Sequence, residues 1–137
     1  MKVIMISRDE KIFDINSAIY ARALEYANLF NELHVVVLAK TKKSINKPVS
    51  SKNLFFYDTT SRFKIVSFFK TLGVATRLAR KMKKGDDWIT SQDPFEGGFI
   101  AFIVSILSGL RLQLQLHTDC FNRYFILHSF GNACRVF

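Results

Sequence analysis

Polar side chains that could bind a ligand follow three apolar stretches of this 137-residue sequence. They are Ser7, Arg8 and Asp9 after the first stretch, Gln92 and Asp93 after a later one, and His117, Thr118 and Asp119 after the last. If each stretch is a strand of one parallel sheet, all three groups lie at the carboxyl edge, where such sheets bind ligands. The sequence therefore predicts a ligand site at that edge.

His117 is the most suggestive single residue, because a neutral imidazole at the end of a strand could donate to a sugar hydroxyl or a phosphate. A loop histidine that bonds only to nearby backbone explains the position equally well, so both interpretations remain open. His34, on an apolar stretch, and His128, in a presumed helix, are interpreted as structural.

The run Asp93-Pro94-Phe95-Glu96 predicts the start of a helix. Asp93 can cap the first turn, Pro94 suits the first helical position, and Glu96 would complete a capping box. This structural role explains both acidic residues, so a ligand-binding role for Asp93 is the weaker interpretation. Gly97 and Gly98 could allow close approach to a ligand, but packing against the sheet is favoured.

Several kinds of chemistry are excluded by missing motifs. The loop after the first stretch reads SRDEKIFD and lacks the glycine pattern that binds a dinucleotide, and no phosphate-binding P-loop occurs elsewhere. The histidines lack metal-ligand spacing, and Cys120 and Cys134 are expected to be reduced, buried thiols. We therefore expect neither a cofactor nor a metal.

The elements that must position these residues follow from apolar patterning. We expect five strands, at Lys2–Ser7, Leu33–Ala39, Asn53–Tyr57, Trp88–Ser91 and Leu110–His117. Between them we expect a loop over 41–51 and three helices, at Ile15–Phe30, at Phe63–Met82 and from Pro94 to a C-terminal cap at Gly109. Residues 118–137 are expected to form a loop and the start of another helix. This alternation predicts a single Rossmann-like α/β domain, with a parallel sheet of strand order 3-2-1-4-5 and helices on both faces.

The net charge of +9 comes from one segment, since residues 41–84 contain twelve basic side chains and one acidic, Asp58. Three functions fit: a solvated helix face, a nucleic-acid groove, or a membrane-surface helix with aromatic and basic sides. Phe63, Val66, Phe69 and Leu72 among these charges favour the membrane surface. The residues predicted to meet anionic lipid are Lys64, Lys70, Arg77, Arg80, Lys81, Lys83 and Lys84.

The sequence starts without a recognisable signal peptide, because MKVIMISRDE turns polar after six residues. Its longest apolar run, Gly98 to Leu110, is shorter than the roughly 20 residues of a membrane span. We therefore expect a cytoplasmic protein that can lie against the inner face of the cell membrane.

Three stretches together resemble the N-terminal domain of a GT-B-fold glycosyltransferase of the family 4 type. They are KVIMISRDEKIFDINSA with the helix ending EYANLFNELHVVV, then ITSQDPFEGGFIA, then LQLQLHTDCFNRYF. Such enzymes join two Rossmann-like domains, of which the first supplies the acceptor site and the second binds the nucleotide-sugar donor. The resemblance implies transfer of a hexose-like sugar, with retention and without a required metal, to a glycan or lipid-linked acceptor.

Residue roles implied by the resemblance follow its motifs. His117 corresponds to the histidine at the cleft floor that contacts the transferred sugar, and Gln92 and Asp93 flank the acceptor side. The loop from Ser7 to Phe13 lines the cleft near donor phosphates or acceptor, although it lacks the glycines that the family often has there.

The sequence ends at Phe137 without the second domain of such enzymes. We therefore expect a fragment, a truncated gene or a split enzyme, inactive alone. The alternative is a non-catalytic α/β binding module whose segment 41–84 binds nucleic acid or an anionic surface.

Overall fold

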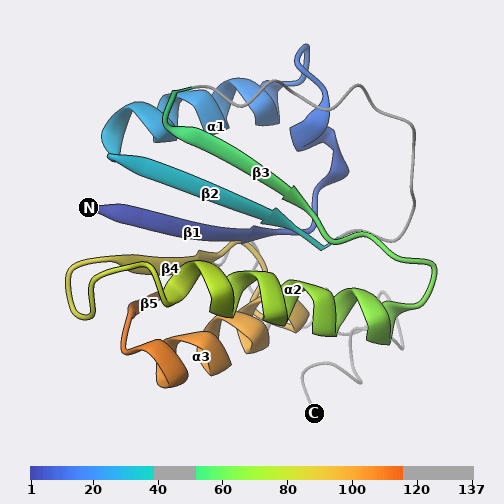
Figure 1. Cartoon of the computed structure of the whole chain (residues 1–137). Coiled ribbons are helices and arrows are strands. Elements are labelled where there is room, and N and C mark those ends of the chain that lie inside the picture. Colours follow the sequence, from blue (N-terminus) through green and yellow to red (C-terminus); the bar gives the residue numbers. More distant parts are fainter. Residues whose placement is uncertain (39–51, 116–137) are drawn as a thin grey trace, which may run out of the picture.

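The computed structural model describes residues 1–38 and 52–115, which form a five-stranded parallel sheet with helices on both faces (Figure 1). The strands are β1 (Lys2–Ser7), β2 (Glu32–Val37), β3 (Leu54–Asp58), β4 (Trp88–Ser91) and β5 (Arg111–Leu114). The helices are the short 3₁₀ helix η1 (Glu10–Phe13) and the α-helices α1 (Ala18–Leu29), α2 (Lys64–Ala79) and α3 (Glu96–Ser108). The strand order, β3-β2-β1-β4-β5, confirms the predicted Rossmann-like α/β fold.

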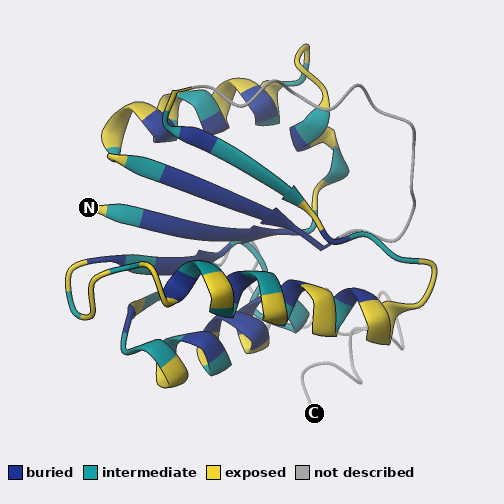
Figure 2. Ribbon diagram, in the orientation of Figure 1, coloured by how far each residue is buried: buried dark blue, intermediate teal, exposed yellow. Residues whose placement is uncertain are grey.

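Strand β1 is the centre of the sheet and is buried from Val3 to Ser7. It pairs in parallel with β2 on one side and with β4 on the other. Its side chains alternate between two hydrophobic cores, as the two-residue repeat of a strand requires. Val3 and Met5 pack with the core under α1, and Ile4 and Ile6 pack with the core under α2 and α3. Figure 2 shows β1 buried over most of its length, with α1 on one side of the sheet and α2 and α3 on the other.

Helix α2 lies against the sheet through a stripe of small residues spaced four apart. These residues, Ser67, Thr71, Ala75 and Ala79, are buried, and they allow the helix backbone to approach the strands closely. The two hydroxyl groups in the stripe are satisfied, because Ser67 donates to the Thr59 carbonyl (2.8 Å) and Thr71 to the Ser67 carbonyl (2.9 Å). The outer side of α2 is thereby left to its longer aromatic and basic residues.

Several element boundaries differ from the sequence predictions. Residues Glu10–Phe13 form η1 where a loop was expected, because the Asp9 carboxylate accepts from the Lys11 N–H (2.9 Å) and caps that turn. Helix α2 ends at Ala79 rather than Met82, and β5 ends at Leu114 rather than His117. Helix α3 ends at Ser108 and is capped by Gly109 as predicted, with φ of 72° in the left-handed region that glycine adopts most easily.

The predictions for the loop over 41–51, for His117, Thr118 and Asp119, and for both cysteines lie outside the described residues.

His34 on β2 is a buried structural histidine, with 9% of its surface exposed. Its Nε2 lies 3.1 Å from Glu32 Oε2, and its Nδ1 lies 3.1 Å from the Tyr57 hydroxyl. Burial lowers the pKa of His34 below its ordinary 6.5, although the Glu32 carboxylate opposes this by favouring the imidazolium. The folded protein therefore holds His34 neutral at a pH where the unfolded chain already binds a proton.

We expect the free energy of unfolding to fall as pH drops through about 6.5, because the unfolded chain then binds a proton at His34 that the folded protein does not. The slope due to this residue is at most about 1.4 kcal/mol per pH unit. Urea unfolding between about pH 5.5 and 7.5 measures it. His34→Gln should flatten this dependence, and Glu32→Gln, which removes the group that raises the pKa, should steepen it. An unchanged slope in His34→Gln would contradict the assignment.

Candidate functional site

The carboxyl ends of β1 and β4 are joined by a side-chain hydrogen bond. The Gln92 N–H donates to the Ile6 carbonyl (3.2 Å), which continues the β1–β4 pairing one residue past β4. This pairing sets Gln92 beside Ser7, whose hydroxyl donates to Gln92 Oε1 at 2.9 Å. Ser7 is fully buried, so the bond fixes the Gln92 amide at the point where the strand order reverses.

Arg8 leaves the end of β1 and reaches the start of α3. Its Nη1 lies 3.8 Å from Asp93 Oδ1, and its Nη2 lies 3.6 Å from Glu96 Oε2. Both separations exceed normal hydrogen-bond lengths of roughly 2.7–3.2 Å, so these are loose ion pairs. The guanidinium is 27% exposed and, within the described residues, makes no hydrogen bond of normal length. It therefore keeps donors that a ligand could use.

Asp93 caps the first turn of α3, but the predicted capping box is wrong. The Asp93 carboxylate accepts from the Phe95 N–H (3.2 Å) and the Gly97 N–H (2.8 Å), and α3 begins at Glu96 rather than Pro94. The Asp93 N–H donates to Ser91 Oγ instead of to Glu96. Glu96 is left to pair with Arg8. Asp93 therefore caps the start of α3 in addition to its loose ion pair with Arg8, and Glu96 pairs with Arg8 instead of closing a capping box.

Gly97 and Gly98 are packing glycines, as the sequence favoured. A Cβ on Gly97 would lie 2.7 Å from Ser91 Oγ and 3.1 Å from Asp93 Oδ2. A Cβ on Gly98 would lie 2.9 Å from the Asp93 carbonyl oxygen. Only glycine lets the first turn of α3 sit this close to the end of β4.

One cavity of about 270 Å³ brings five predicted site residues together. We call it the crevice. Its polar lining includes all of the candidates that the structure describes, Ser7, Arg8, Asp9, Gln92 and Asp93. Its floor is apolar and includes Met5, Ile12 and Ile19. A cavity lined by both apolar and polar side chains suits a sugar, whose ring faces are apolar and whose edges carry hydroxyl groups.

Arg22 on α1 also lines the crevice, and the sequence analysis did not single it out. It is exposed, and the described residues supply it with no ion-pair partner. Spacing on the helix offered a weak signal, because Arg22 falls between Ile19 and Tyr26, which line the same cavity. Nothing local distinguished it from an ordinary exposed arginine of an amphipathic helix.

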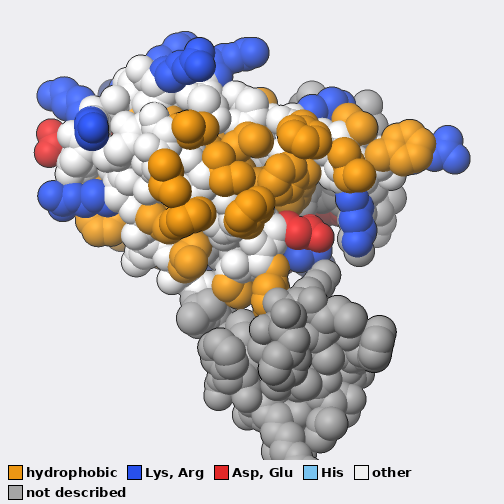
Figure 3. All heavy atoms as spheres, turned by 90° about the horizontal axis from the view of Figure 1, so that it is seen from below, with side chains coloured by type: hydrophobic (Ala, Val, Ile, Leu, Met, Phe, Trp, Pro, Cys, Tyr) orange, Lys and Arg blue, Asp and Glu red, His pale blue; other side chains and the backbone are white. Residues whose placement is uncertain are grey.

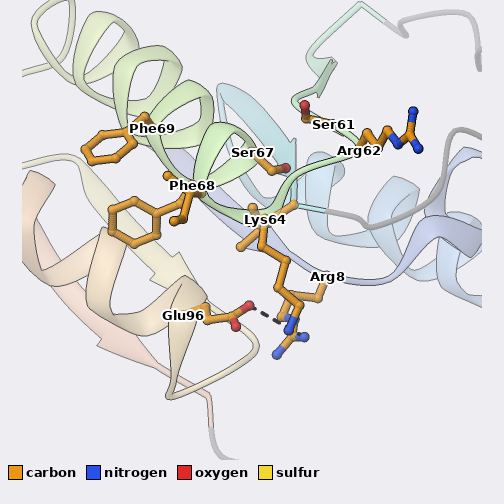
Figure 4. Close-up of a pocket in the computed structure, with 10 residues that line it drawn as sticks. Arg8, Ser61, Arg62, Lys64, Ser67, Phe68, Phe69 and Glu96 are labelled. Carbon is orange, nitrogen blue, oxygen red and sulfur yellow. Dashed lines mark ion pairs between the residues drawn. The ribbon is translucent and has the colours of Figure 1, made fainter.

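A second cavity, of about 350 Å³, lies at the start of α2; we call it the α2 pocket (Figure 4). Arg8 lines both cavities. In the close-up the side chains of Arg8 and Lys64 extend toward the side of the pocket where Glu96 lies, while Arg62 points away from it. Ile65, Phe68 and Phe69 supply apolar walls on α2.

The seven basic residues predicted to meet lipid are all exposed, on α2 or directly after it. They are Lys64, Lys70, Arg77, Arg80, Lys81, Lys83 and Lys84. The adjoining surface of α3, a helix that contains no charged residue after Glu96, was not predicted as part of this surface from the sequence. Exposed hydrophobic side chains on the two helices form what we call the outer apolar face, consisting of Ile65, Phe69, Phe99, Phe102, Ile106 and Leu107. Figure 3 shows hydrophobic side chains gathered over this side of the molecule, with Lys and Arg around the margin.

Two negative findings apply to residues 1–38 and 52–115. They contain no group of three or more His, Cys, Asp or Glu side chains placed to hold a metal ion. None of their helices combines the length and apolar character of a membrane-crossing segment.

The fold and the crevice define a Rossmann-like α/β domain with a cavity at its strand-order switch. No protein-family model matches this chain, and no curated protein sequence matches it. Two solved structures share the fold, both of the C-terminal domain of the PF1911 hydrogenase from Pyrococcus furiosus.

The first of these, residues 78–226 of that protein, is 13% identical with a TM-score of 0.52, covering 84% of this chain and 91% of that chain. The second, residues 83–215, is 12% identical with a TM-score of 0.51, covering 82% and 89%. At such identities the likeness shows the fold alone.

Substituting Gly97 and Gly73 should have opposite effects on stability. Gly97→Ala forces a Cβ against Ser91 and Asp93, and we expect it to lower the free energy of unfolding by roughly 1–3 kcal/mol. Gly73→Ala is the matched control, since its Cβ meets nothing within 4 Å; it should stabilise α2 by about 0.5–1 kcal/mol. Urea denaturation measures both, and a neutral Gly97→Ala would refute the tight contact between α3 and β4.

Proposed function

We propose that this chain is the acceptor-side domain of a glycosyltransferase, and that the crevice holds the acceptor. It works with a donor-binding domain, which supplies the nucleotide sugar. The observation that carries the proposal is the convergence of Ser7, Arg8, Asp9, Gln92 and Asp93 on one cavity at the carboxyl ends of β1 and β4.

The chemistry of the crevice supports a sugar ligand. Asp9 and Gln92 offer a carboxylate and an amide to hydroxyl groups, and the Ser7 hydrogen bond holds the amide in place. Met5, Ile12 and Ile19 provide the apolar surface on which a sugar ring can pack. Arg8 and Arg22 add positive charge suited to the phosphates of a donor brought to the crevice mouth.

The family resemblance assigns the remaining polar contacts to the segment after β5. His117 is proposed to contact the transferred sugar, with Thr118 and Asp119 beside it. The pairing of β5 with β4 supports this assignment, because Leu114 at the end of β5 pairs with Ser91 at the end of β4.

An NMR titration with free disaccharides tests the crevice directly. Maltose, cellobiose and chitobiose are suitable probes, and weak binding is expected because one domain offers half of the contacts. Amide shifts should change for Ser7, Arg8, Asp9, Gln92 and Asp93, and Gln92→Ala should reduce the binding constant at least about tenfold, which corresponds to one lost buried hydrogen bond. Asn31→Ala, distant from the crevice, is the control.

Two results would count against a sugar-binding crevice. One is the absence of amide chemical-shift changes with every disaccharide. The other is a set of changes confined to residues outside the crevice. Binding that Gln92→Ala leaves unchanged would remove the role given to the Gln92 amide.

A second function, docking to an anionic membrane, is favoured by the outer apolar face and its basic margin. Exposed fractions of 49–68% for Phe99, Phe102, Ile106 and Leu107 are unusual for apolar side chains of an isolated surface helix. An interfacial helix pair places such side chains among lipid headgroups, and each nearby Lys or Arg adds about 1 kcal/mol on an anionic leaflet. This arrangement would bring the crevice to a lipid-linked acceptor at the inner face of the cell membrane.

Vesicle co-sedimentation separates the apolar and electrostatic parts of this docking. Binding to vesicles with phosphatidylglycerol should exceed binding to pure phosphatidylcholine by tenfold or more. Phe99→Ser with Phe102→Ser should weaken it, while Leu29→Ser, an exposed apolar residue on α1, should not. Lys70→Gln with Arg77→Gln should weaken it more than Lys11→Gln. Equal binding to neutral vesicles would contradict the electrostatic part.

The alternative class is a non-catalytic module that binds nucleic acid through segment 41–84. This alternative predicts a gel shift with double-stranded or single-stranded nucleic acid that weakens steeply as the salt concentration rises. Such a shift, unaffected by Phe99→Ser with Phe102→Ser and combined with no vesicle binding, would replace the membrane proposal.

A further inference from the structure

We propose that the α2 pocket binds the phosphate head of a lipid whose chains lie along the outer apolar face. This inference names the class of acceptor, a phosphate-headed lipid, and that part of it rests on the proposed function. The binding site itself follows from the pocket.

The charged side chains that line the pocket are mostly basic, since Arg8, Arg62 and Lys64 face one carboxylate, Glu96. Arg8 directly follows β1 and Lys64 is the first residue of α2, so the pocket receives positive charge from two different elements (Figure 4). The Arg8 guanidinium forms loose ion pairs with the carboxylates of Asp93 and Glu96, at nitrogen–oxygen distances of 3.8 and 3.6 Å. Lys64 has no carboxylate within ion-pair distance in the described part of the chain, so its charge is available to an anion seated in the pocket.

The two cations are suited to phosphate. A guanidinium presents planar pairs of N–H donors that match phosphate oxygens, and an ammonium adds a point charge beside it. Within residues 1–38 and 52–115 no hydrogen bond of normal length uses the Arg8 donors, because both of its ion pairs are too long. Arg8 is thus held in place by two carboxylates and still has donors to offer.

The opposite wall of the pocket is apolar and continues into the outer apolar face. Leu38 and Phe68 line the interior, and Ile65 and Phe69, 72% and 63% exposed, belong to both the pocket and the face. Phe68 also stacks on Phe99 of α3, with ring centroids 6.3 Å apart. An apolar path therefore runs from the cations across α2 to α3.

The size of the pocket fits a headgroup and the first part of a chain. Its volume of about 350 Å³ is at the lower end of small-molecule sites, about 300–1,000 Å³. Longer chains would have to lie on the surface, where exposed Phe102, Ile106 and Leu107 extend the apolar path. An amphiphile with an anionic head satisfies both ends of this surface, whereas a free anion uses only one.

Because Arg8 lines both cavities, a phosphate head in the α2 pocket would lie next to the crevice. A group attached to that phosphate could then reach toward Ser7 and Gln92. The arrangement gives the α2 pocket the role of anchoring the acceptor, and the crevice the role of presenting its reacting end.

Titration with short-chain lipids below their micelle concentration tests the inference on the chain as it exists. The probe is dihexanoyl phosphatidic acid, compared with dihexanoyl phosphatidylcholine and with inorganic phosphate. We expect the phosphatidic acid to bind at least tenfold more tightly than either, with shifts at Arg8, Lys64, Ile65 and Phe68.

Lys64→Gln should weaken phosphatidic acid binding about tenfold, a loss of one charge-assisted contact. Lys70→Gln is the matched control on the same helix, removing the same charge from outside the pocket, and should change binding less than twofold. Ile65→Ser should weaken the phosphatidic acid while leaving any inorganic phosphate binding unchanged.

Three results would overturn the inference. Inorganic phosphate binding as tightly as phosphatidic acid would show an anion site without a lipid role. Equal binding of the phosphatidylcholine would show apolar adsorption that ignores the head. Equal losses in Lys64→Gln and Lys70→Gln would show diffuse attraction to the whole basic surface.

Failure of this inference is distinguishable from failure of the proposed function. Disaccharide shifts in the crevice without phosphatidic acid binding would leave the glycosyltransferase proposal and remove the lipid anchor. Phosphatidic acid binding at Lys64 without any disaccharide shift would leave a lipid-binding α/β domain.

Discussion

The burial of β1 between β2 and β4 is the constraint on which the rest of the molecule depends. Because β1 pairs on both sides and is covered on both faces, the loops that follow it and β4 must leave the sheet next to each other. The Ser7–Gln92 hydrogen bond joins those two loops at their origin. The crevice is the space they enclose, so its position follows from strand pairing rather than from any single ligand-binding residue.

Arg8 connects the crevice to the α2–α3 side of the molecule. It extends from the end of β1 to the start of α3, and it lines both cavities. From the α2 pocket an apolar surface continues across both helices, bordered by exposed basic residues. The crevice and the α2 pocket thus share Arg8, and the α2 pocket shares Ile65 and Phe69 with the outer apolar face. The proposed sugar-transfer domain, acting on a phosphate-headed lipid, would need such shared borders.

The sequence predicts the strand order and the helices on both faces of the sheet, because β-branched runs and parallel topology determine them. The same topology predicts which polar residues converge at the ends of β1 and β4, namely Ser7, Arg8, Asp9, Gln92 and Asp93. The pairing of Glu96 with Arg8, which replaces the predicted capping box, could not be predicted, because the sequence does not distinguish a Glu96 that bonds to its own helix end from one that pairs with Arg8. Arg22 and the outer side of α3 were missed for another reason: an exposed arginine has no local signature, and exposed and buried sides of an all-apolar helix look alike in sequence.

The central claim is that a sugar binds in the crevice between the ends of β1 and β4. Intermolecular nuclear Overhauser effects between a bound disaccharide and methyl groups of the chain test it most directly, because the crevice floor contributes methyls from Met5, Ile12 and Ile19. The account predicts contacts from sugar ring protons to these three methyl-bearing residues. Contacts confined to the methyls of α2 and α3, such as Ile65 or Ile106, would contradict it.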